Sequence, residues 1–237
     1  MTFLVYLRSA VFLFCAIITT ITVTPWVFIL KFLPFATRYQ IANTWVKLVL
    51  WEVETICGLR YEIEGLEHIK NIPTAIVLCK HQSAWETIAL RKILPMQSNL
   101  LKKSLLKIPF WGWAMASLKP IAINRNNQRA ALAQLLKQGQ ERLAEGFWVI
   151  VFPEGTRTAP GETKKFNAGG ALLAEKTGYP VIPMAHNAGR FWARYSFLKY
   201  PGVIKVKIGP AIATAGRKAK EINQEAETWI NQAMQDL

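Results

Sequence analysis

Residues 74–86 read TAIVLCKHQSAWE, a continuous apolar run that is followed at once by a cluster of polar side chains. A short apolar run of this kind is typical of a strand that is buried on both faces of a sheet. The pattern of residues 83–94 predicts a helix directly after it. Strands and helices then alternate along the chain, so we predict an α/β fold with a mostly parallel or mixed central sheet flanked by helices.

The expected elements of this fold begin shortly after residue 55. Strands are expected over residues 59–64, 74–79, 120–123, 147–152, 181–185 and 203–208, and helices over residues 83–94, 128–145, 168–177 and 218–234. The last helix carries its apolar side chains on one stripe, which is typical of a helix that covers a sheet. The length of 237 residues fits one such domain over residues 56–237 and a separate N-terminal segment over residues 1–55.

The N-terminal segment is strongly apolar and is expected to be helical and membrane-anchoring. Residues 9–30 contain no charged side chain. As a helix they would measure roughly 33 Å, long enough to cross a bilayer core of about 30 Å. Two predictions stay open: one membrane-spanning helix, or a helical hairpin that bends at Pro25 and inserts into one leaflet. A cleaved signal peptide fits poorly, because no small-residue cleavage site follows.

The charge of the chain favours an anionic partner. Lys and Arg total 29 against 15 acidic residues, a net charge of +14, and no acidic residue lies between Glu86 and Glu141 or between Glu175 and Glu221. Such basic windows suit nucleic acid, a membrane surface or a phosphorylated substrate. No zinc, helix-turn-helix or RNA-binding signature is present, so membrane phospholipid is favoured and nucleic acid is not expected.

The three cysteines, Cys15, Cys57 and Cys79, have no metal-ligand spacing and leave one unpaired. A disulfide scaffold and a zinc ribbon are therefore excluded, and a reducing compartment is indicated. No metal site is predicted.

Polar side chains follow the strand of residues 74–79, where its carboxyl end reaches the edge of the sheet at which ligands gather. His81 and Glu86 can meet if His81 precedes the helix and Glu86 lies in its first turn. Because Ser83 is followed three residues later by Glu86, the alternative is that Glu86 only completes a capping box.

Two further strands end in polar clusters. Residues 121–125 read IAINR and end at Arg125, and residues 152–157 read FPEGTR and end at Arg157. Taken alone, the second cluster also fits a tight turn with a solvent-facing arginine. Because the three strand ends share one edge, we expect a base beside a cluster of cations large enough for a phosphate.

The order of these blocks carries a family resemblance. The blocks are His81-x-x-x-x-Glu86, IAINR, FPEGTR and the apolar VIPM of residues 181–184, and they span roughly residues 75–187. Together they resemble the glycerolipid acyltransferase family, and within it the bacterial lysophosphatidate acyltransferases (1-acyl-sn-glycerol-3-phosphate acyltransferases). That family usually has Asp at the position of Glu86. The departure adds one methylene and retains a carboxylate.

The resemblance implies a mechanism for residues 56–237 as an acyltransferase catalytic domain. His81 is then the general base that takes the proton of an acceptor hydroxyl, and Glu86 orients its imidazole. The alkoxide attacks the thioester of acyl-CoA or acyl-carrier protein directly, and no cofactor is implied. The absence of a Gly-x-Ser-x-Gly motif agrees with a reaction that has no acyl-enzyme.

The resemblance also implies which residues hold the substrates. The positions implied for the glycerol phosphate are Arg125, Glu154, Gly155, Thr156 and Arg157. Further candidates for the phosphates of the acceptor or donor are Lys102, Lys103, Lys164 and Lys165. Arginine suits this task because its planar group donates to two phosphate oxygens at once.

We therefore expect a membrane-bound acyltransferase that makes phosphatidate from lysophosphatidate and acyl-CoA or acyl-carrier protein. The resemblance places it at a bacterial inner membrane, with the active site on the cytoplasmic face. One alternative is an acyltransferase for another lyso-lipid, such as a lyso-ornithine lipid. The other is a non-catalytic basic protein that binds membranes.

Overall fold

The computed structural model describes residues 2–109, 111–124 and 127–237. The strands are β1 (Leu59–Glu64), β2 (Ile76–Cys79), β3 (Gln97–Lys102), β4 (Ile121–Ile123), β5 (Trp148–Val151), β6 (Val181–His186) and β7 (Gly202–Ile208). The α-helices are α1 (Thr2–Ile29), α2 (Phe35–Cys57), α3 (Trp85–Ile93), α4 (Trp111–Ala116), α5 (Gln128–Ala144), α6 (Gly169–Thr177) and α7 (Ala219–Gln235). Short 3₁₀ helices are η1 (Leu66–Ile69), η2 (Lys103–Lys107) and η3 (Ala188–Arg190).

The strands form one seven-stranded sheet in the order β1-β7-β6-β2-β5-β3-β4. Only the β6–β7 pair is antiparallel among the described strands, and the other neighbours are parallel. The predicted α/β fold with a mixed sheet is therefore confirmed. β2 lies in the middle, which explains why its sequence is continuously apolar: all its residues are buried.

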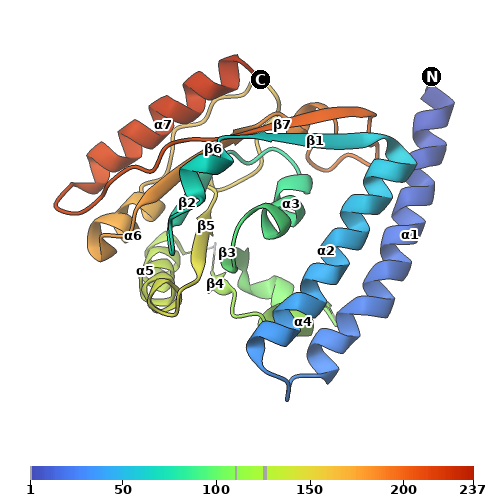
Figure 1. The fold of residues 1–237 in the computed structure, drawn as a ribbon, viewed down its shortest axis with the longest axis horizontal. Helices are drawn as coiled ribbons and strands as arrows, with labels where there is room; N and C mark the ends of the chain where they lie inside the picture. The colour runs from blue at the N-terminus through green and yellow to red at the C-terminus, as the bar shows by residue number, and fades with distance from the viewer. Residues whose placement is uncertain (1, 110, 125–126) are drawn as a thin grey trace.

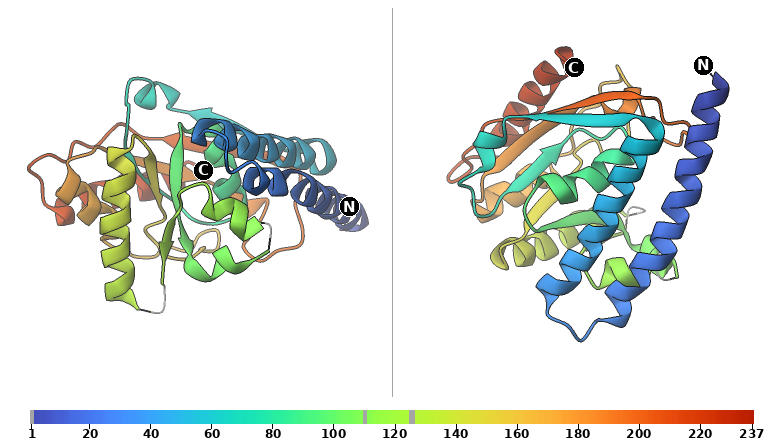
Figure 2. Two further views of the ribbon diagram at one scale, coloured as in Figure 1. Left: turned by 90° about the horizontal axis from the view of Figure 1, so that it is seen from below. Right: turned by 45° about the vertical axis from the view of Figure 1, so that its right-hand side comes forward.

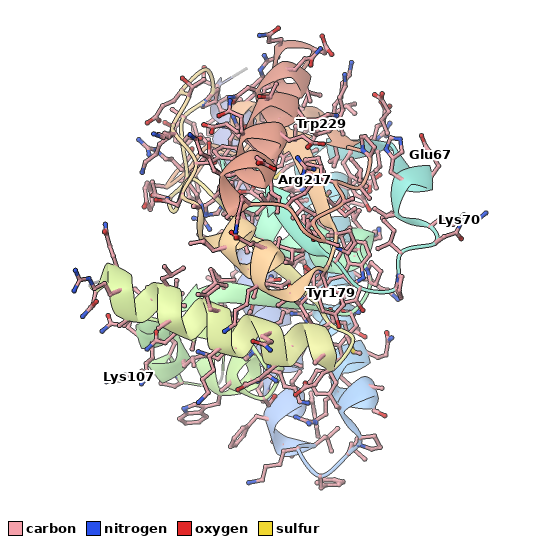
Figure 3. All side chains as sticks on the ribbon, turned by 90° about the vertical axis from the view of Figure 1, so that its left-hand side faces the viewer. Glu67, Lys70, Lys107, Tyr179, Arg217 and Trp229 are labelled. Carbon is pink, nitrogen blue, oxygen red and sulfur yellow. The ribbon has the colours of Figure 1, made fainter. Side chains whose placement is uncertain are left out.

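Helices cover both faces of the sheet and create two buried cores (Figure 1). Along β2, Ile76 and Leu78 point to the core formed with α5, α6 and α7, and Val77 points to the core formed with α2 and α3. Figure 3 shows the first of these layers from outside, with Trp229 on α7 and Arg217 just before that helix. The alternation of neighbouring side chains between the cores follows from the two-residue period of a strand.

The N-terminal residues form a helical hairpin, but it does not bend at Pro25 as one prediction had it. Pro25 lies inside α1, and the chain turns over residues 30–34 instead. Pro34 precedes α2 in an extended conformation, and a residue before a proline disfavours helical backbone, so Leu33 stays non-helical between the end of α1 at Ile29 and the start of α2 at Phe35. Figure 2 shows α1 and α2 side by side along one flank of the molecule.

Polar contacts fix α1 against α2. The Thr19 hydroxyl hydrogen-bonds the buried carboxylate of Glu52, and the indole N–H of Trp45 donates to the Thr20 hydroxyl at 3.0 Å. Phe12 and Val46 belong to the same buried core as the strands, so the hairpin is packed onto the α/β domain. α2 ends at Cys57, two residues beyond the expected boundary at residue 55.

Within the described residues, one helix, Thr2–Ile29, is long and apolar enough to cross a membrane by length and composition. It leaves many large apolar side chains exposed, including Phe3, Phe14 and Ile21.

The strand β3 and the short helix α4 were not predicted from the sequence. β3 reads QSNLLK and lacks the β-branched and aromatic residues by which strands are recognised. Its polar side chains are buried because they have backbone partners: Gln97 donates to the Leu90 carbonyl at 2.6 Å, and Ser98 to the Lys119 carbonyl at 2.6 Å.

Candidate active site

His81 and Glu86 meet at the carboxyl end of β2. The His81 Nδ1 atom lies 2.7 Å from Glu86 Oε1, and the same oxygen accepts hydrogen bonds from the backbone N–H groups of Gln82 (3.0 Å) and Ser83 (2.9 Å). Glu86 thus contacts the imidazole and also satisfies the N–H groups ahead of α3, so the two interpretations of this residue hold together. With Nδ1–H donated to Glu86, the other ring nitrogen, Nε2, is left as the proton acceptor.

Glu86 is fully buried, yet it is held as a carboxylate. Burial alone would raise its pKa, but His186, His81 and the Ser83 N–H group stabilise the negative charge and lower the pKa below its usual value of 4.5. The ionised form is the one that accepts the proton of Nδ1, so this environment supports the orientation of His81.

A second histidine, His186 at the end of β6, lies close to the other carboxylate oxygen of Glu86. Its Nε2 atom lies 3.9 Å from Glu86 Oε2 and donates to the Lys80 carbonyl at 2.8 Å, and its Nδ1 accepts from the N–H group of Ala188 at 3.3 Å. Burial lowers the pKa of His186, partly offset by the Glu86 carboxylate. Burial thus disfavours the charged form of His186, and its hydrogen bonds fix its orientation beside the pair.

Glu154 holds the backbone of His81 in place. One of its oxygens forms a buried ion pair with Lys80, and the other accepts from the His81 N–H group at 2.8 Å. Thr158 also fixes the His81 backbone, because its N–H group donates to the His81 carbonyl at 2.8 Å. Glu154 has no exposed surface, and both of its carboxylate oxygens bind groups of the protein. The resemblance implied instead that Glu154 contacts the substrate.

The remaining residues of the FPEGTR block form a tight turn beside His81. The N–H group of Gly155 donates to the Phe152 carbonyl at 3.0 Å, and Gly155 has a φ of 72°, a conformation that favours glycine. The Phe152 ring stacks on the His81 imidazole with 4.0 Å between ring centroids. Thr156 and Arg157 are half-buried, and the Nε atom of Arg157 has no hydrogen-bond partner among the described residues.

The four candidate lysines lie on the surface. Lys102 ends β3, Lys103 begins η2, and both are exposed, as are Lys164 and Lys165 in the loop before α6. Arg125, the other predicted phosphate ligand, lies outside the described residues. The structure thus brings His81, Glu86, Glu154 and Gly155 together, and the four lysines are exposed and do not line the cavity beside His81.

An apolar cavity of about 450 Å³ opens beside His81, within the size range of small-molecule sites. Gly155 lines its mouth, and its walls come from the ends of β3, β4 and β5 and from α5 and α6. Its apolar lining includes Leu100, Ile123, Ala131, Leu132, Leu135 and Leu172. An imidazole with a free acceptor nitrogen therefore lies at one end of a hydrophobic chamber.

Three of the residues that build this site were not singled out from the sequence: Lys80, Thr158 and His186. Lys80 directly precedes His81, and a lysine that ends a buried strand is a signal for a buried ion pair. His186 stands two residues after the VIPM block, at the edge of the sheet where sites gather. In the described part of the chain, no group of three or more His, Cys, Asp or Glu could hold a metal ion.

These motifs and this fold define a class of protein. A family model described as Acyltransferase matches residues 60–187, which contain all four blocks. The chain belongs to this acyltransferase family and is an enzyme that transfers acyl groups.

Individual relatives are similar over most of the chain. The 1-acyl-sn-glycerol-3-phosphate acyltransferase of Pseudomonas aeruginosa is 46% identical over 214 residues, covering 89% of this chain and 83% of the relative. The chloroplastic LPAT1 of Arabidopsis thaliana, of the same name, is 31% identical over 66% of this chain and 43% of its own length. The crystal structure of the acyltransferase PlsC from Thermotoga maritima matches with a TM-score of 0.81 at 22% identity, covering 97% of this chain and 94% of that one, which shows a shared fold.

Proposed function

We propose that this protein transfers an acyl chain from acyl-CoA or acyl-carrier protein to the free hydroxyl of 1-acyl-sn-glycerol-3-phosphate, giving phosphatidate. The observation that carries the proposal is the His81 imidazole, oriented by Glu86, at the mouth of an apolar cavity. The name and the 46% identity of the Pseudomonas relative support lysophosphatidate as the acceptor.

In the proposed reaction, His81 Nε2 takes the proton of the acceptor hydroxyl while the oxygen attacks the thioester carbon. The C–S bond then breaks, and the thiolate leaves with the proton that His81 carries. A thioester is already activated, so correct placement of the base and the hydroxyl supplies much of the rate enhancement. Glu86 stabilises the imidazolium that forms when Nε2 is protonated.

The cavity fits an acyl chain better than a polar group. Its walls beyond His81 are aliphatic, and burial of a methylene there is favourable by about 0.8 kcal/mol. Among the described residues, the polar side chains that line it are His81, Gln128 and Asn167. We place the chain inside and the reacting thioester beside His81.

We assign the acceptor phosphate to Arg157, Arg125 and the candidate lysines. Arg157 is half-buried, and its Nε is buried with no internal acceptor, so a phosphate oxygen would satisfy it. Arg125 and the four lysines named above remain proposed contacts of the acceptor or donor phosphates.

We also propose that α1 inserts into one leaflet of the cytoplasmic face of a bacterial inner membrane. α1 lies along α2, and α2 packs on the sheet through Val46 and Val53, so a spanning α1 would draw this packed layer into the bilayer. Insertion into one leaflet instead buries the exposed apolar side chains of α1 and leaves the active site at the interface.

The test is an acceptor panel with the full-length protein in detergent micelles or liposomes. Release of free thiol from acyl-CoA and from acyl-carrier protein is measured with lysophosphatidate, lyso-ornithine lipid or no acceptor. Thiol release that requires lysophosphatidate and is abolished by His81→Ala supports the proposal. Release that requires lyso-ornithine lipid assigns the other acceptor, and no release with either acceptor or donor contradicts the proposed reaction.

A further inference from the structure

Arg91, in the last turn of α3, carries a buried charge that the protein leaves without a partner. The residue is 8% exposed, and its guanidinium forms no hydrogen bond or ion pair within the described part of the chain. The Nη2 atom is fully buried and has no acceptor. Buried charges in proteins are normally paired, so this guanidinium signals a missing anion.

The groups that surround Arg91 stabilise its charge without accepting its hydrogen bonds. The guanidinium lies over the Tyr39 ring at 4.6 Å from the centroid, and the negative end of the α3 dipole is nearby. The Tyr39 hydroxyl already accepts from the N–H group of Gln97 at 3.0 Å, and the Leu90 carbonyl accepts from the Gln97 amide. Burial lowers the pKa of Arg91, because desolvation disfavours its charged form.

A cavity of about 340 Å³ opens at Arg91 between α2 and the end of α3. Its lining contains three cations, Arg91, Lys47 and Lys92, and no acidic residue. Asn43 also lines it, and the Oδ1 atom of this side chain is buried without a hydrogen-bond partner. The cavity thus offers cationic donors for an anion and a carbonyl oxygen for a hydroxyl group.

This chemistry fits a phosphate that carries a hydroxyl-bearing group. Arg91 donates through a planar fork that matches phosphate oxygens, while Asn43 Oδ1 accepts from a hydroxyl. The exposed side chains of Leu48 and Trp51 follow Lys47 on α2, so acyl chains could lie along the hairpin when the phosphate is in the cavity.

We propose that the cavity between α2 and α3 binds the phosphate of an anionic phospholipid headgroup, at a site separate from the acyl-transfer cavity. The two cavities have no lining residue in common. Arg91 and Glu86 are five residues apart on α3, which places their Cα atoms roughly 7–8 Å apart along the helix axis. The site would hold the hairpin at the membrane through one bound lipid.

The experiment uses the full-length protein in detergent micelles doped with phosphatidylglycerol or phosphatidylcholine. Lipid retention is measured by native mass spectrometry, and the melting temperature is followed as lipid is added. Phosphatidylglycerol is neither the proposed acceptor nor the proposed product. We expect it to be retained and to raise the melting temperature, whereas phosphatidylcholine does neither.

Variants locate the binding site. Arg91→Gln is expected to weaken phosphatidylglycerol binding by about tenfold or more, since it removes a charged hydrogen-bond donor, and Lys47→Gln by about threefold. Lys220→Gln, an equal charge change at an exposed position of α7, should leave binding within about twofold of wild type. Should Arg91→Gln fail to fold, the binding of phosphatidylglycerol by Lys47→Gln decides the result, because Lys47 is exposed and its substitution leaves the core intact.

Equal retention of the two lipids, or wild-type phosphatidylglycerol affinity in the folded Arg91→Gln and Lys47→Gln variants, overturns the proposal. In a second experiment, inorganic phosphate alone is added in place of the lipid, or to the lipid-bound protein. If it raises the melting temperature in an Arg91-dependent manner and displaces phosphatidylglycerol, the cavity binds the phosphate group from either source. None of these readouts depends on acyl transfer, so a failure here is distinct from a failure of the proposed reaction.

Discussion

The Lys80 ammonium and the Glu154 carboxylate form an ion pair that joins the loop after β2 to the loop after β5. The two residues are 4% and 0% exposed, and the second Glu154 oxygen accepts from the N–H group of His81 at 2.8 Å. The backbone of the proposed base is therefore fixed by a charge pair buried beneath it. Lys80 and Glu154 are 74 residues apart in the sequence, and the strands that they follow are hydrogen-bonded neighbours in the sheet.

Glu154→Gln is expected to destabilise the fold and reduce turnover together. Removing one member of a buried ion pair leaves an uncompensated charge and costs about 3–5 kcal/mol in the free energy of unfolding. Denaturant unfolding measures that loss, and steady-state kinetics should show a lower kcat with little change in the KM for lysophosphatidate. A raised acceptor KM with unchanged stability would instead show that Glu154 contacts the acceptor, as the family resemblance implied.

Glu86→Gln should lower kcat by about 10²-fold or more, because glutamine no longer stabilises a protonated imidazole. Its amide oxygen can still accept from Ser83, so the melting temperature should change far less than the rate. Glu86→Asp should keep more activity than Glu86→Gln, since the carboxylate is retained. If Gln is the more active variant, Glu86 serves only the start of α3.

The sequence predicts the sheet well where burial dictates composition. β2 and β5 are buried on both faces and therefore read as apolar runs, whereas β3 buries Gln97 and Ser98 through hydrogen bonds that no local pattern reveals. The bend at Pro25, one of the two predictions left open for the N-terminal segment, is wrong. An internal proline removes only one helical hydrogen bond, and packing against α2 keeps α1 continuous through Pro25.

The candidate site was predictable to the extent that its residues are adjacent in sequence. His81 and Glu86 are five positions apart. Their contact could be predicted because β2 ends just before His81 and α3 begins with Glu86 in its first turn. The contacts of Lys80 with Glu154 and of His186 with Glu86 join distant segments. Such contacts depend on the order of the strands in the sheet, which the sequence pattern does not specify.

Ala131→Trp should shorten the acyl chain that the enzyme accepts. Ala131 lies on α5 and lines the cavity, so an indole there would occupy part of the volume assigned to the chain. A series of acyl-CoA donors of increasing chain length should show the optimum moving to shorter chains. Ala133→Trp, an exposed position on the same helix, is the matched control and should keep the wild-type preference. Identical chain-length profiles for both variants would argue against this cavity as the acyl site.

Arg157→Ala should raise the KM for lysophosphatidate by about tenfold, with a smaller effect on the KM for the acyl donor. Arg157→Lys should recover only part of the loss, because lysine lacks the planar fork. The exposed Arg190 offers a control with the same change of charge, and Arg190→Ala should leave both constants near wild type. A shift in the donor KM alone would assign Arg157 to the donor phosphates.

The stability of the protein should fall as the pH drops below about 6.5, in part through His186. Burial lowers the pKa of His186 in the folded state, so the unfolded chain takes up this proton first. Its contribution is complete above the unfolded pKa of about 6.5 and is lost as the pH falls towards the folded pKa. Glu86 does not contribute in this window, because its pKa is lowered from 4.5.

Melting temperatures at pH 7.5 and pH 5.5 test this dependence on His186. In His186→Gln the difference between the two temperatures should be smaller than in wild type, because glutamine has no proton to take up and its amide can still donate to the Lys80 carbonyl. His68→Gln, in η1 on the surface, is the control and should show the wild-type difference. Equal differences in all three proteins would mean that the neutral state of His186 is not what limits stability in acid.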